Sequence, residues 1–394
     1  MSRDDTILDL IERLKTGRLT RRQFVARGLA LGVSLSAVGT LLAACGDTGD
    51  GEAATGATLP PMDETKPDEI VVFNWAEYLA PPVRKGFEKE YGIKVKETYF
   101  DNNETMLAKL KAGATGYDIA VPTGYTASVL IKSGMVEPLD YDYLPNMQNT
   151  LPAFVDPVYD PGTDGLHYTA PYMWGTAGYC LRTDILDDPI TRWADLWDEK
   201  YKDKISMMFD ERECLGAALK LLGSSLNTTN EDEINAASDK LIEQKPLVQK
   251  YVITNSYREI VSGKAPITHC WNGEVGLAAN SLGEGSEKIM RYVFPDEGFS
   301  TWVDTLVIPV GGNSRYGAHL LMDYLMRPEV SAENALWVGY LPISQEALDT
   351  VKAENPVADL IIPTEADMER AEVLGDVGEA AKLYSAAWQR VVAA

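Results

Sequence analysis

Hydrophobic and polar residues follow a repeating strand–helix pattern over residues 69–133. Residues 69–75 (EIVVFNW) form an apolar run typical of a buried strand. Pro81-Pro82 and Gly92 enclose a helical pattern, since proline favours the first helical turn and glycine the position after the last. We therefore expect an α/β lobe with a mostly parallel sheet. Its predicted elements are strands over 69–75, 93–100 and 117–121, and helices over 81–91, 102–113 and 126–133.

A second α/β pattern follows an extended stretch over 168–181 that could leave the first lobe. We expect residues 67–175 and 304–350 to form lobe 1, and residues 176–303 and 351–394 to form lobe 2. The two crossings of the chain predict a cleft between the lobes, where ligands are often bound.

The pattern predicts further strands and helices in the rest of the body. Strands are expected over 205–209, 248–253, 265–271, 290–294 and 302–310. Helices are expected over 215–222, 231–244, 257–263, 316–325 and 330–337, with a helix through Leu277, a turn over 339–342 and a helical tail to Gln389.

The N-terminal 44 residues have the pattern of an export signal. Arg21-Arg22 precede an uncharged apolar stretch over 28–44, as in twin-arginine signals. Leu42 to Cys45 resembles a bacterial lipobox, which implies that Cys45 is acylated and anchors the protein by lipid alone. A transmembrane anchor is the alternative, but the apolar stretch is short for a span. Residues 45–66 are rich in Gly, Ala, Thr and Asp, and we expect a flexible tether.

The acidic balance of the chain narrows its partners. The net charge is −23 over 394 residues, which argues against nucleic acid or an anionic membrane as a partner and tolerates cationic ligands. Beyond Cys45 there are three cysteines, Cys180, Cys214 and Cys270, so the body has at most one disulfide. We expect free buried thiols, with a Cys214–Cys270 bridge as the alternative.

Two carboxylates, Asp210 and Glu213, stand between a predicted strand and a predicted helix. Spaced i and i+3, they share one face of the first helical turn and would face the crevice beyond the strand ends. Such a pair suits a cationic ligand. The alternative is that both are N-terminal helix acids favoured by the helix dipole.

Aromatic residues recur at the ends of predicted strands, where a core residue is not expected. Together with Asp304 they would form a box of ring faces and carboxylates, which selects a slender organic cation. Cation–π contacts contribute about 0.5–2 kcal/mol each, and charge-assisted hydrogen bonds about 1.5–3 kcal/mol, so a few of each allow micromolar binding. The aromatic residues are Trp75, Tyr78, Tyr125, Trp271, Trp302 and Tyr340.

Several motifs resemble the periplasmic spermidine/putrescine-binding proteins of ABC importers, in order from about residue 70 to 384. The segments are 73–78 (FNWAEY), 103–106 (NETM), 117–122 (YDIAVP), 193–197 (WADLW), 271–273 (WNG), 302–304 (WVD) and 338–340 (VGY). The WADLW segment is shared widely among extracytoplasmic binding proteins, whereas the first and the WVD segments are more particular to polyamine binders. The resemblance implies a two-lobe periplasmic-binding-protein fold (type II), with lobes joined by two crossover strands.

The resemblance also implies roles for the candidate residues. Asp210 and Glu213 would hold one terminal amine and Asp304 a second amine, while the six aromatic residues line the methylene path. Ser256 matches a minor polar contact. Ala76 stands where family members often have a hydroxyl residue, and Leu374 where a ligand-contacting Gln is found. A polyamine, an ABC permease and its ATPase are the implied partners, no cofactor is implied, and the protein would act outside the cytoplasm as a monomer.

The same residues allow a few different functions. A hydrolase would use Asp210 and Glu213 as an acid/base pair. Neighbouring acids on one helical turn are poorly placed to flank a bond from opposite sides, but Asp304 could be the acid on the other side. A binding protein for another organic amine and a surface polyamine sensor are also compatible with the sequence. An oxyanion binder would need Arg or free backbone amides where this chain has acids. The histidines His167, His269 and His319 show no metal-ligand spacing.

Overall fold

A computed structural model describes residues 59–162, 165–253 and 255–394. They belong to one compact unit, Ala57–Ala394. The predicted export signal over 1–44 and the lipidation site at Cys45 lie outside the described residues. Of the expected tether, residues 59–66 contain no helix or strand. The Pro60 carbonyl there accepts a hydrogen bond of 2.9 Å from Arg315.

Three parallel strands form the sheet of the first lobe, in the order β2-β1-β3. The sequence signals act where they were expected. Pro81 stands in the first turn of α4, and Gly92 ends this helix with a φ of 72°, a conformation that glycine adopts without steric cost. Asn102 caps α5 by accepting a hydrogen bond from the Thr105 amide. The elements are β1 (Glu69–Trp75), α4 (Pro81–Tyr91), β2 (Lys94–Phe100), α5 (Asn103–Lys111), β3 (Ile119–Ala120) and α6 (Gly124–Lys132).

The second sheet is mixed, with the strand order β13-β10-β5-β8-β6-β7. Strands β8, β6 and β7 are parallel to one another, and a helix follows each of them. The carboxyl ends of these strands therefore meet at one edge of the sheet, where the helices begin. The elements are β6 (Ile205–Met208), α7 (Glu211–Leu221), α8 (Glu231–Gln244), β7 (Val248–Val252), α9 (Tyr257–Ser262), β8 (Ile267–Trp271), α10 (Asn272–Leu282) and β9 (Met290–Val293).

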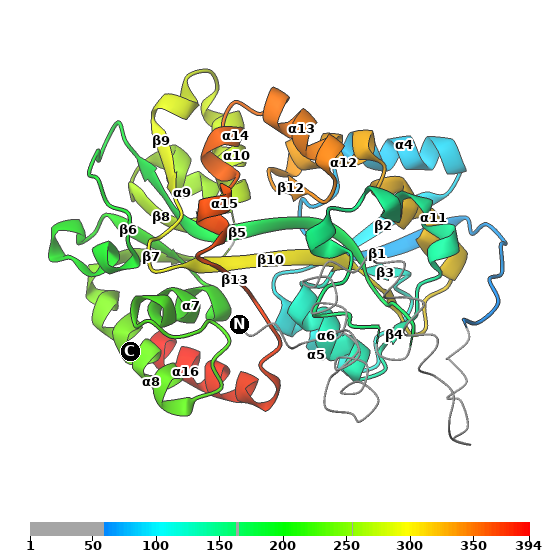
Figure 1. The fold of residues 1–394 in the computed structure, drawn as a ribbon, viewed down its shortest axis with the longest axis horizontal. Coiled ribbons are helices and arrows are strands. Elements are labelled where there is room, and N and C mark those ends of the chain that lie inside the picture. The colour runs from blue at the N-terminus through cyan, green and yellow to red at the C-terminus, as the bar shows by residue number, and fades with distance from the viewer. Residues whose placement is uncertain (1–58, 163–164, 254) are drawn as a thin grey trace, which may run out of the picture. The chain divides into compact units, whose positions relative to one another are not determined.

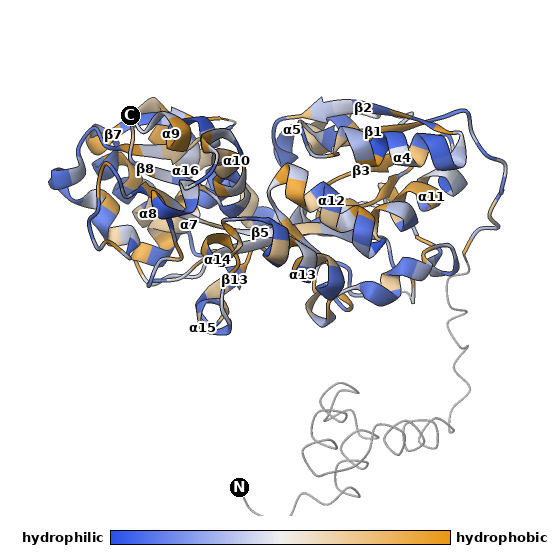
Figure 2. Ribbon diagram, turned by 90° about the horizontal axis from the view of Figure 1, so that it is seen from above, coloured by the Kyte–Doolittle hydropathy of each residue, from blue (hydrophilic) through white to orange (hydrophobic). Residues whose placement is uncertain are grey.

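Two long strands cross between the lobes: β5 (Ala170–Arg182) and β10 (Phe299–Leu306). Every residue of both is buried. The first part of β5 pairs with β10 and β12, and its second part pairs with β8 and β9. Figure 1 shows β5 and β10 side by side across the middle, and Figure 2 shows the elements grouped on either side of β5.

The remaining elements complete the two lobes. The helices are α11 (Arg315–Leu325), α12 (Pro328–Val338), α13 (Gln345–Glu354), α14 (Ala358–Ile361), α15 (Glu365–Met368) and α16 (Ala381–Ala393). The short strands are β4 (Val136–Glu137), β11 (Ile308–Pro309), β12 (Leu341–Pro342) and β13 (Ala371–Val373). Single turns of 3-10 helix occur at Tyr141–Tyr143, Pro145–Asn149, Pro152–Phe154, Trp193–Trp197, Glu199–Tyr201, Lys245–Leu247, Ser286–Lys288 and Gly378–Ala380.

Three expectations about local structure were wrong. The strand expected over 302–310 begins earlier, at Phe299, and is divided into β10 and β11. The turn expected over 339–342 contains β12, which pairs with β5. The tail expected to be helical contains β13, which pairs with β10 in parallel. Strands of two or three residues carry no visible alternation, so sequence periodicity cannot reveal them.

Separate hydrophobic cores support the two lobes. Phe87 and Leu321 belong to the core beside the first sheet. Trp193, Leu215 and Tyr384 belong to a core beneath the second sheet. Each sheet is thus held by its own core, and this fixes the side chains at the sheet edges that face the other lobe. Within the described residues, no helix combines the length and apolarity needed to cross a bilayer.

The cysteines of the body are free and buried. Cys180, Cys214 and Cys270 form no disulfide. The expectation of free thiols is confirmed, and the alternative Cys214–Cys270 bridge is not formed.

Candidate functional site

A cavity of about 350 Å³ lies between the elements of the two lobes. Its wall combines the ends of β1, β6 and β8, the middle of β10 and the segment before β12. All nine residues assigned to the box of carboxylates and rings line it, whereas Ser256, the expected minor polar contact, does not. The nine are Trp75, Tyr78, Tyr125, Asp210, Glu213, Trp271, Trp302, Asp304 and Tyr340. The structure thus brings together residues that are far apart in the sequence.

Asp304 lies within β10, where its carboxylate receives two hydroxyl donors. Tyr78 donates to Oδ2 at 2.7 Å and Thr123 donates to Oδ1 at 2.7 Å. The side chain is buried, and burial raises its pKa to about 6. A carboxylate in this position is held rigidly but is poorly compensated for its lost hydration. The expectation that the aromatic residues stand at strand ends was wrong for Trp302, which like Asp304 lies mid-strand because β10 itself crosses the cleft.

Asp210 and Glu213 lie at the start of α7. The Asp210 carboxylate caps the helix by accepting a hydrogen bond of 2.9 Å from the Glu213 amide. Glu213 accepts 2.9 Å from Trp271 Nε1 and 2.5 Å from the Ser300 hydroxyl. Burial, with the Asp210 charge, raises the pKa of Glu213 to about 7. Asp210 thus acts as a helix cap and also contributes to the cavity wall, so its two interpretations are compatible.

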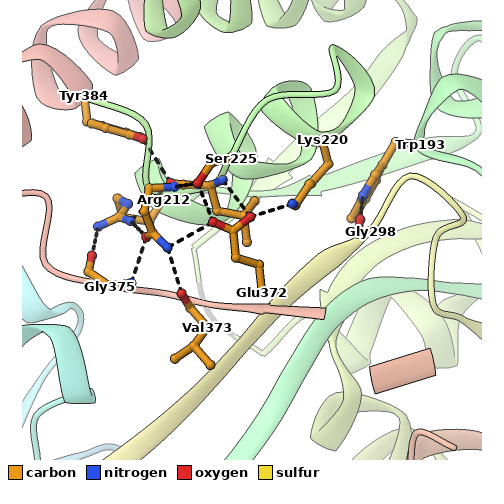
Figure 3. Close-up of polar contacts among 11 residues, drawn as sticks. Trp193, Arg212, Lys220, Ser225, Gly298, Glu372, Val373, Gly375 and Tyr384 are labelled. Atoms are coloured by element: carbon orange, nitrogen blue, oxygen red, sulfur yellow. Dashed lines mark hydrogen bonds and ion pairs between the residues drawn. The ribbon is translucent and has the colours of Figure 1, made fainter. Parts of the chain in front are cut away.

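Arg212, between the two predicted acids, is a cavity residue that the sequence interpretation missed. Its guanidinium lies 5.3 Å from the ring centroid of Tyr125 and 4.9 Å from that of Tyr384. It also donates to the Gly375 carbonyl at 3.2 Å and to Asn227 Oδ1 at 3.0 Å, as Figure 3 shows in part. Its positive charge partly neutralises Asp210 and Glu213. Its contact with Tyr125 also links α7 to α6. A lone arginine among acids in the sequence does not reveal this geometry.

Strand β13 brings Leu374 to the cavity wall. Glu372 fixes this strand through Lys220, Ser225 and the Leu226 amide, as seen in Figure 3. Because the strand hydrogen-bonds to β10 as well, Leu374 has little freedom to move away from the cavity.

Three aromatic rings form a continuous surface in the cavity. The ring of Tyr340 makes edge contacts with Trp302 at 5.0 Å and with Tyr78 at 5.8 Å between centroids. A Cβ at Gly273 would lie 2.3 Å from the Tyr340 ring, and one at Gly175 would lie 2.5 Å from the Trp302 ring. These two glycines therefore allow the rings to sit against the backbone. Trp302 Nε1 is buried and has no hydrogen-bond partner among the residues that the structure describes.

Trp75 and Tyr125 are held by polar contacts within lobe 1. Trp75 Nε1 donates 2.9 Å to the Val121 carbonyl. Asn103, which the sequence interpretation did not assign to the site, donates 3.0 Å to the hydroxyls of Tyr125 and Thr123. Asn103 lines the cavity and links Tyr125, through Thr123, to Asp304. An asparagine at the start of a helix gives no signal of this second role.

The histidines take no part in the site. Burial lowers the pKa of His269 to about 3, and the ring is neutral. His319 accepts a hydrogen bond of 2.9 Å from the Asp140 amide, and His167 stacks on Tyr141. Among the described residues, no group of three or more His, Cys, Asp or Glu side chains is placed to hold a metal ion.

The comparisons with known proteins agree with this geometry. A family model described as bacterial extracellular solute-binding protein matches residues 83–360. The spermidine/putrescine-binding periplasmic protein of Salmonella typhimurium is 34% identical over 83% of this chain and 92% of its own length. The chain belongs to the spermidine/putrescine-binding family of extracellular solute-binding proteins.

Other members of this solute-binding family are also similar. The putrescine/agmatine-binding protein of Pseudomonas aeruginosa is 29% identical, over 85% of this chain and 95% of its own. The TpPotD lipoprotein of Treponema pallidum has 28% identity and a TM-score of 0.73, over 82% of this chain and 99% of that one. The chain therefore has the mixed α/β, two-lobe fold of periplasmic solute-binding proteins, as expected.

The two positions expected to depart from the family pattern border the cavity. Ala76 and Leu374 each line it and give it apolar wall. Ser256 is buried but lies outside the lining residues, hydrogen-bonded to Glu274. Glu274 itself lines the cavity and was not anticipated from the sequence.

Proposed function

We propose that this protein is the substrate-binding component of an ABC importer and captures a polyamine in the cavity between its lobes. The observation that carries the proposal is the combination of buried carboxylates and ring faces around one cavity. Asp304 and Glu213 are each about 5% exposed, burial raises the pKa of both, and neither forms an ion pair with a described residue. A flexible cation with separated ammonium groups supplies the missing counter-charge.

Recognition would divide between polar and apolar parts of the ligand. One terminal ammonium pairs with Asp210 and Glu213, and another ammonium pairs with Asp304. The methylene segments lie against the rings of Trp75, Tyr78, Tyr125, Trp271, Trp302 and Tyr340. Charge-assisted hydrogen bonds of about 1.5–3 kcal/mol each and cation–π contacts of about 0.5–2 kcal/mol offset the cost of ordering the ligand.

Ligand capture would also shift the protein towards a closed state. Carboxylates of lobe 2 and rings of lobe 1 contact the same ligand, so the ligand favours the conformation in which both surround it. A membrane permease, driven by its ATPase, would recognise that conformation. We further propose that the exported protein is a monomer held to the membrane by a lipid on Cys45.

Isothermal titration calorimetry of the purified protein tests the proposal. Putrescine, spermidine and spermine should be compared, and spermidine is expected to bind at micromolar concentration or tighter, about −8 kcal/mol or more favourable. Sodium or a neutral diol of similar length should give no specific heat. Absence of binding by all three amines would overturn the proposal, and hydrolysis of a polyamine conjugate would favour the alternative hydrolase.

The lipid anchor has its own test. Cells supplied with labelled palmitate should incorporate label into the wild-type protein and not into the Cys45→Ser variant. Equal labelling of both would rule out this attachment site, without affecting the ligand proposal.

A further inference from the structure

Arg212 is a buried cation whose side chain contacts both lobes. Within lobe 2, its guanidinium donates to the Gly375 carbonyl at 3.2 Å, as Figure 3 shows, and lies 4.9 Å from the ring centroid of Tyr384. Towards lobe 1, the guanidinium lies 5.3 Å from the ring centroid of Tyr125 in α6. The side chain is only 6% exposed, so water is largely excluded from these contacts.

The ring of Tyr125 is held in place from within lobe 1. Asn103 donates 3.0 Å to the Tyr125 hydroxyl, and Glu104 also hydrogen-bonds to it, both from the start of α5. A cation over a tyrosine ring is attracted to it, more strongly where water is excluded. Separation of the lobes would break this ring contact, whereas the contacts of Arg212 within lobe 2 would persist.

Carboxylates of both lobes lie around Arg212. Partial burial and the Asp210 charge raise the pKa of Glu104, and the Arg212 charge opposes this shift. Burial and the Glu104 charge raise the pKa of Glu211 to about 7, and the Arg212 charge opposes this shift as well. Glu104 belongs to lobe 1, whereas Asp210 and Glu211 belong to lobe 2. Contact between the lobes therefore brings like charges together, and Arg212 offsets their repulsion.

We infer that Arg212 is a positioning residue that controls closure of the lobes and does not select the ligand. Its contact with Tyr125 and its charge allow the ligand-free protein to populate the closed arrangement, in which the two lobes meet. The apparent affinity of a ligand is proportional to the populated fraction of the binding-competent state. Because this fraction belongs to the protein, Arg212 should raise the affinity for every amine by the same factor. The inference rests on the proposed function and adds to it the group that sets the closed population.

Distances between spin labels on the two lobes test the inference without a ligand. Labels are placed at Lys111→Cys and Lys382→Cys, which are exposed residues of lobe 1 and lobe 2. The background is Cys45→Ser, because the other three cysteines are buried. Part of the ligand-free protein should show the distance found in saturating spermidine. Arg212→Met should lower this closed fraction at least threefold.

Two further variants separate closure from folding. Arg390→Met removes the same charge from lobe 2, where Arg390 pairs with Asp239, and should keep the wild-type closed fraction. Glu104→Gln, added to Arg212→Met, removes the like charge on lobe 1 and should restore part of the closed fraction. A purely structural role of Arg212 within lobe 2 would not produce this rescue.

Calorimetry supplies the second readout. Arg212→Met should weaken the binding of putrescine and of spermidine about fivefold each, so that the ratio of the two affinities stays within twofold of wild type. A loss confined to one amine would mean that Arg212 contacts that ligand. Tighter binding of both amines would mean that the guanidinium mainly repels the ammonium. Either result would overturn the inference.

The remaining outcomes separate the inference from the proposed function. Identical ligand-free distances in wild type and Arg212→Met would overturn the inference, while the polyamine proposal stands. Wild-type protein that binds neither amine would contradict the proposed function itself. If Arg212→Met does not fold, Arg212→Lys takes its place, because it keeps the charge but lacks the planar guanidinium. Its closed fraction should lie below that of wild type, and an unchanged fraction would overturn the inference.

Discussion

The two lobes contribute different polar groups to the cavity, although both supply aromatic rings. In lobe 1, the polar atoms of three rings have partners: Trp75 Nε1 donates to the Val121 carbonyl, Tyr78 donates to Asp304, and the Tyr125 hydroxyl accepts from Asn103. Lobe 2 adds the rings of Trp271 and Trp302, and carboxylates at the starts of α7 and α10, where burial raises the pKa of both Glu213 and Glu274 to about 7. These three rings of lobe 1 are therefore satisfied without a ligand, whereas burial leaves the carboxylates of lobe 2 electrostatically unfavourable.

This difference indicates where binding free energy and selectivity arise. A neutral, hydrogen-bonded aromatic surface can be covered at little cost, and it accepts any slender apolar segment. A buried carboxylate without a cation is unfavourable, so covering lobe 2 is favourable only when a cation is enclosed. Lobe 1 thus provides shape, and lobe 2 provides the requirement for positive charge. Asp304 joins the two, because its strand is shared and its donors come from lobe 1.

The largest effect is expected at this junction. Asp304→Ala removes a buried charge and leaves the hydroxyls of Tyr78 and Thr123 without their acceptor. Loss of one partner of a buried hydrogen-bonded charge pair costs about 2–5 kcal/mol, so spermidine affinity should fall about 100-fold or more in calorimetry. Asp304→Asn, which keeps the shape, separates the charge from the packing. An affinity within threefold of wild type for Asp304→Ala would contradict the central role given to this residue.

A smaller loss is expected for Glu213→Gln. The substitution preserves the acceptor for Trp271 Nε1 but removes one of two neighbouring charges, so spermidine binding should weaken at least tenfold, or about 1.4 kcal/mol. Glu211→Gln is the matched control, because Glu211 lies in the same helical turn, hydrogen-bonds to Ser385 and does not line the cavity. If Glu213→Gln and Glu211→Gln bind spermidine with equal affinity, the charge at the start of α7 acts only at long range and Glu213 does not contact the ligand.

Affinity should also depend on pH, by up to about 20-fold between pH 8 and pH 6. The pKa values of about 7 for Glu213 and about 6 for Asp304 mean that both carboxyls take up protons over this range, while polyamine nitrogens stay charged. The ligand must then displace those protons, and binding weakens as the pH falls.

The stability of the ligand-free protein should change in the opposite direction. The folded-state pKa of Glu213 lies above its ordinary value of 4.5, so the folded state binds protons more tightly than the unfolded chain. This carboxyl therefore makes the ligand-free protein less stable as the pH rises from about 4.5 to about 7. Spermidine should raise the melting temperature more at pH 8 than at pH 6. A larger rise at pH 6 would contradict the assignment.

Much of lobe 1 could be predicted from the sequence because its signals are local. Pro81 and Gly92 define α4 by their own backbone preferences, and the apolar run over 69–75 is β1. The site residues identified by aromatic and acidic type also proved to line one cavity. Their roles in binding remain a prediction.

The parts that the sequence did not reveal depend on long-range contacts. Strand β13 has only three residues and exists because β10 offers an edge and because Glu372 is held by Lys220. Arg212 and Glu274 each look like an ordinary charged residue in a helical turn. Only the packing of α7 against lobe 1, and of α10 against α9, places their side chains in the cavity wall.

The smallest effect should come from the ion pair between α6 and the segment before α16. Lys132 Nζ lies 2.6 Å from Asp376, but the lysine side chain is 67% exposed. Exposed pairs contribute about 0–1 kcal/mol, so Lys132→Met should weaken spermidine binding less than about threefold, and less still in high salt. Lys382→Met, which breaks an exposed pair with Glu379 within one segment, is the control for the charge change. The contrary outcome is that Lys132→Met lowers spermidine affinity as much as Glu213→Gln does. Contact between the lobes outside the cavity would then contribute as much to binding as the cavity carboxylates, and the difference between the two lobes would no longer account for binding.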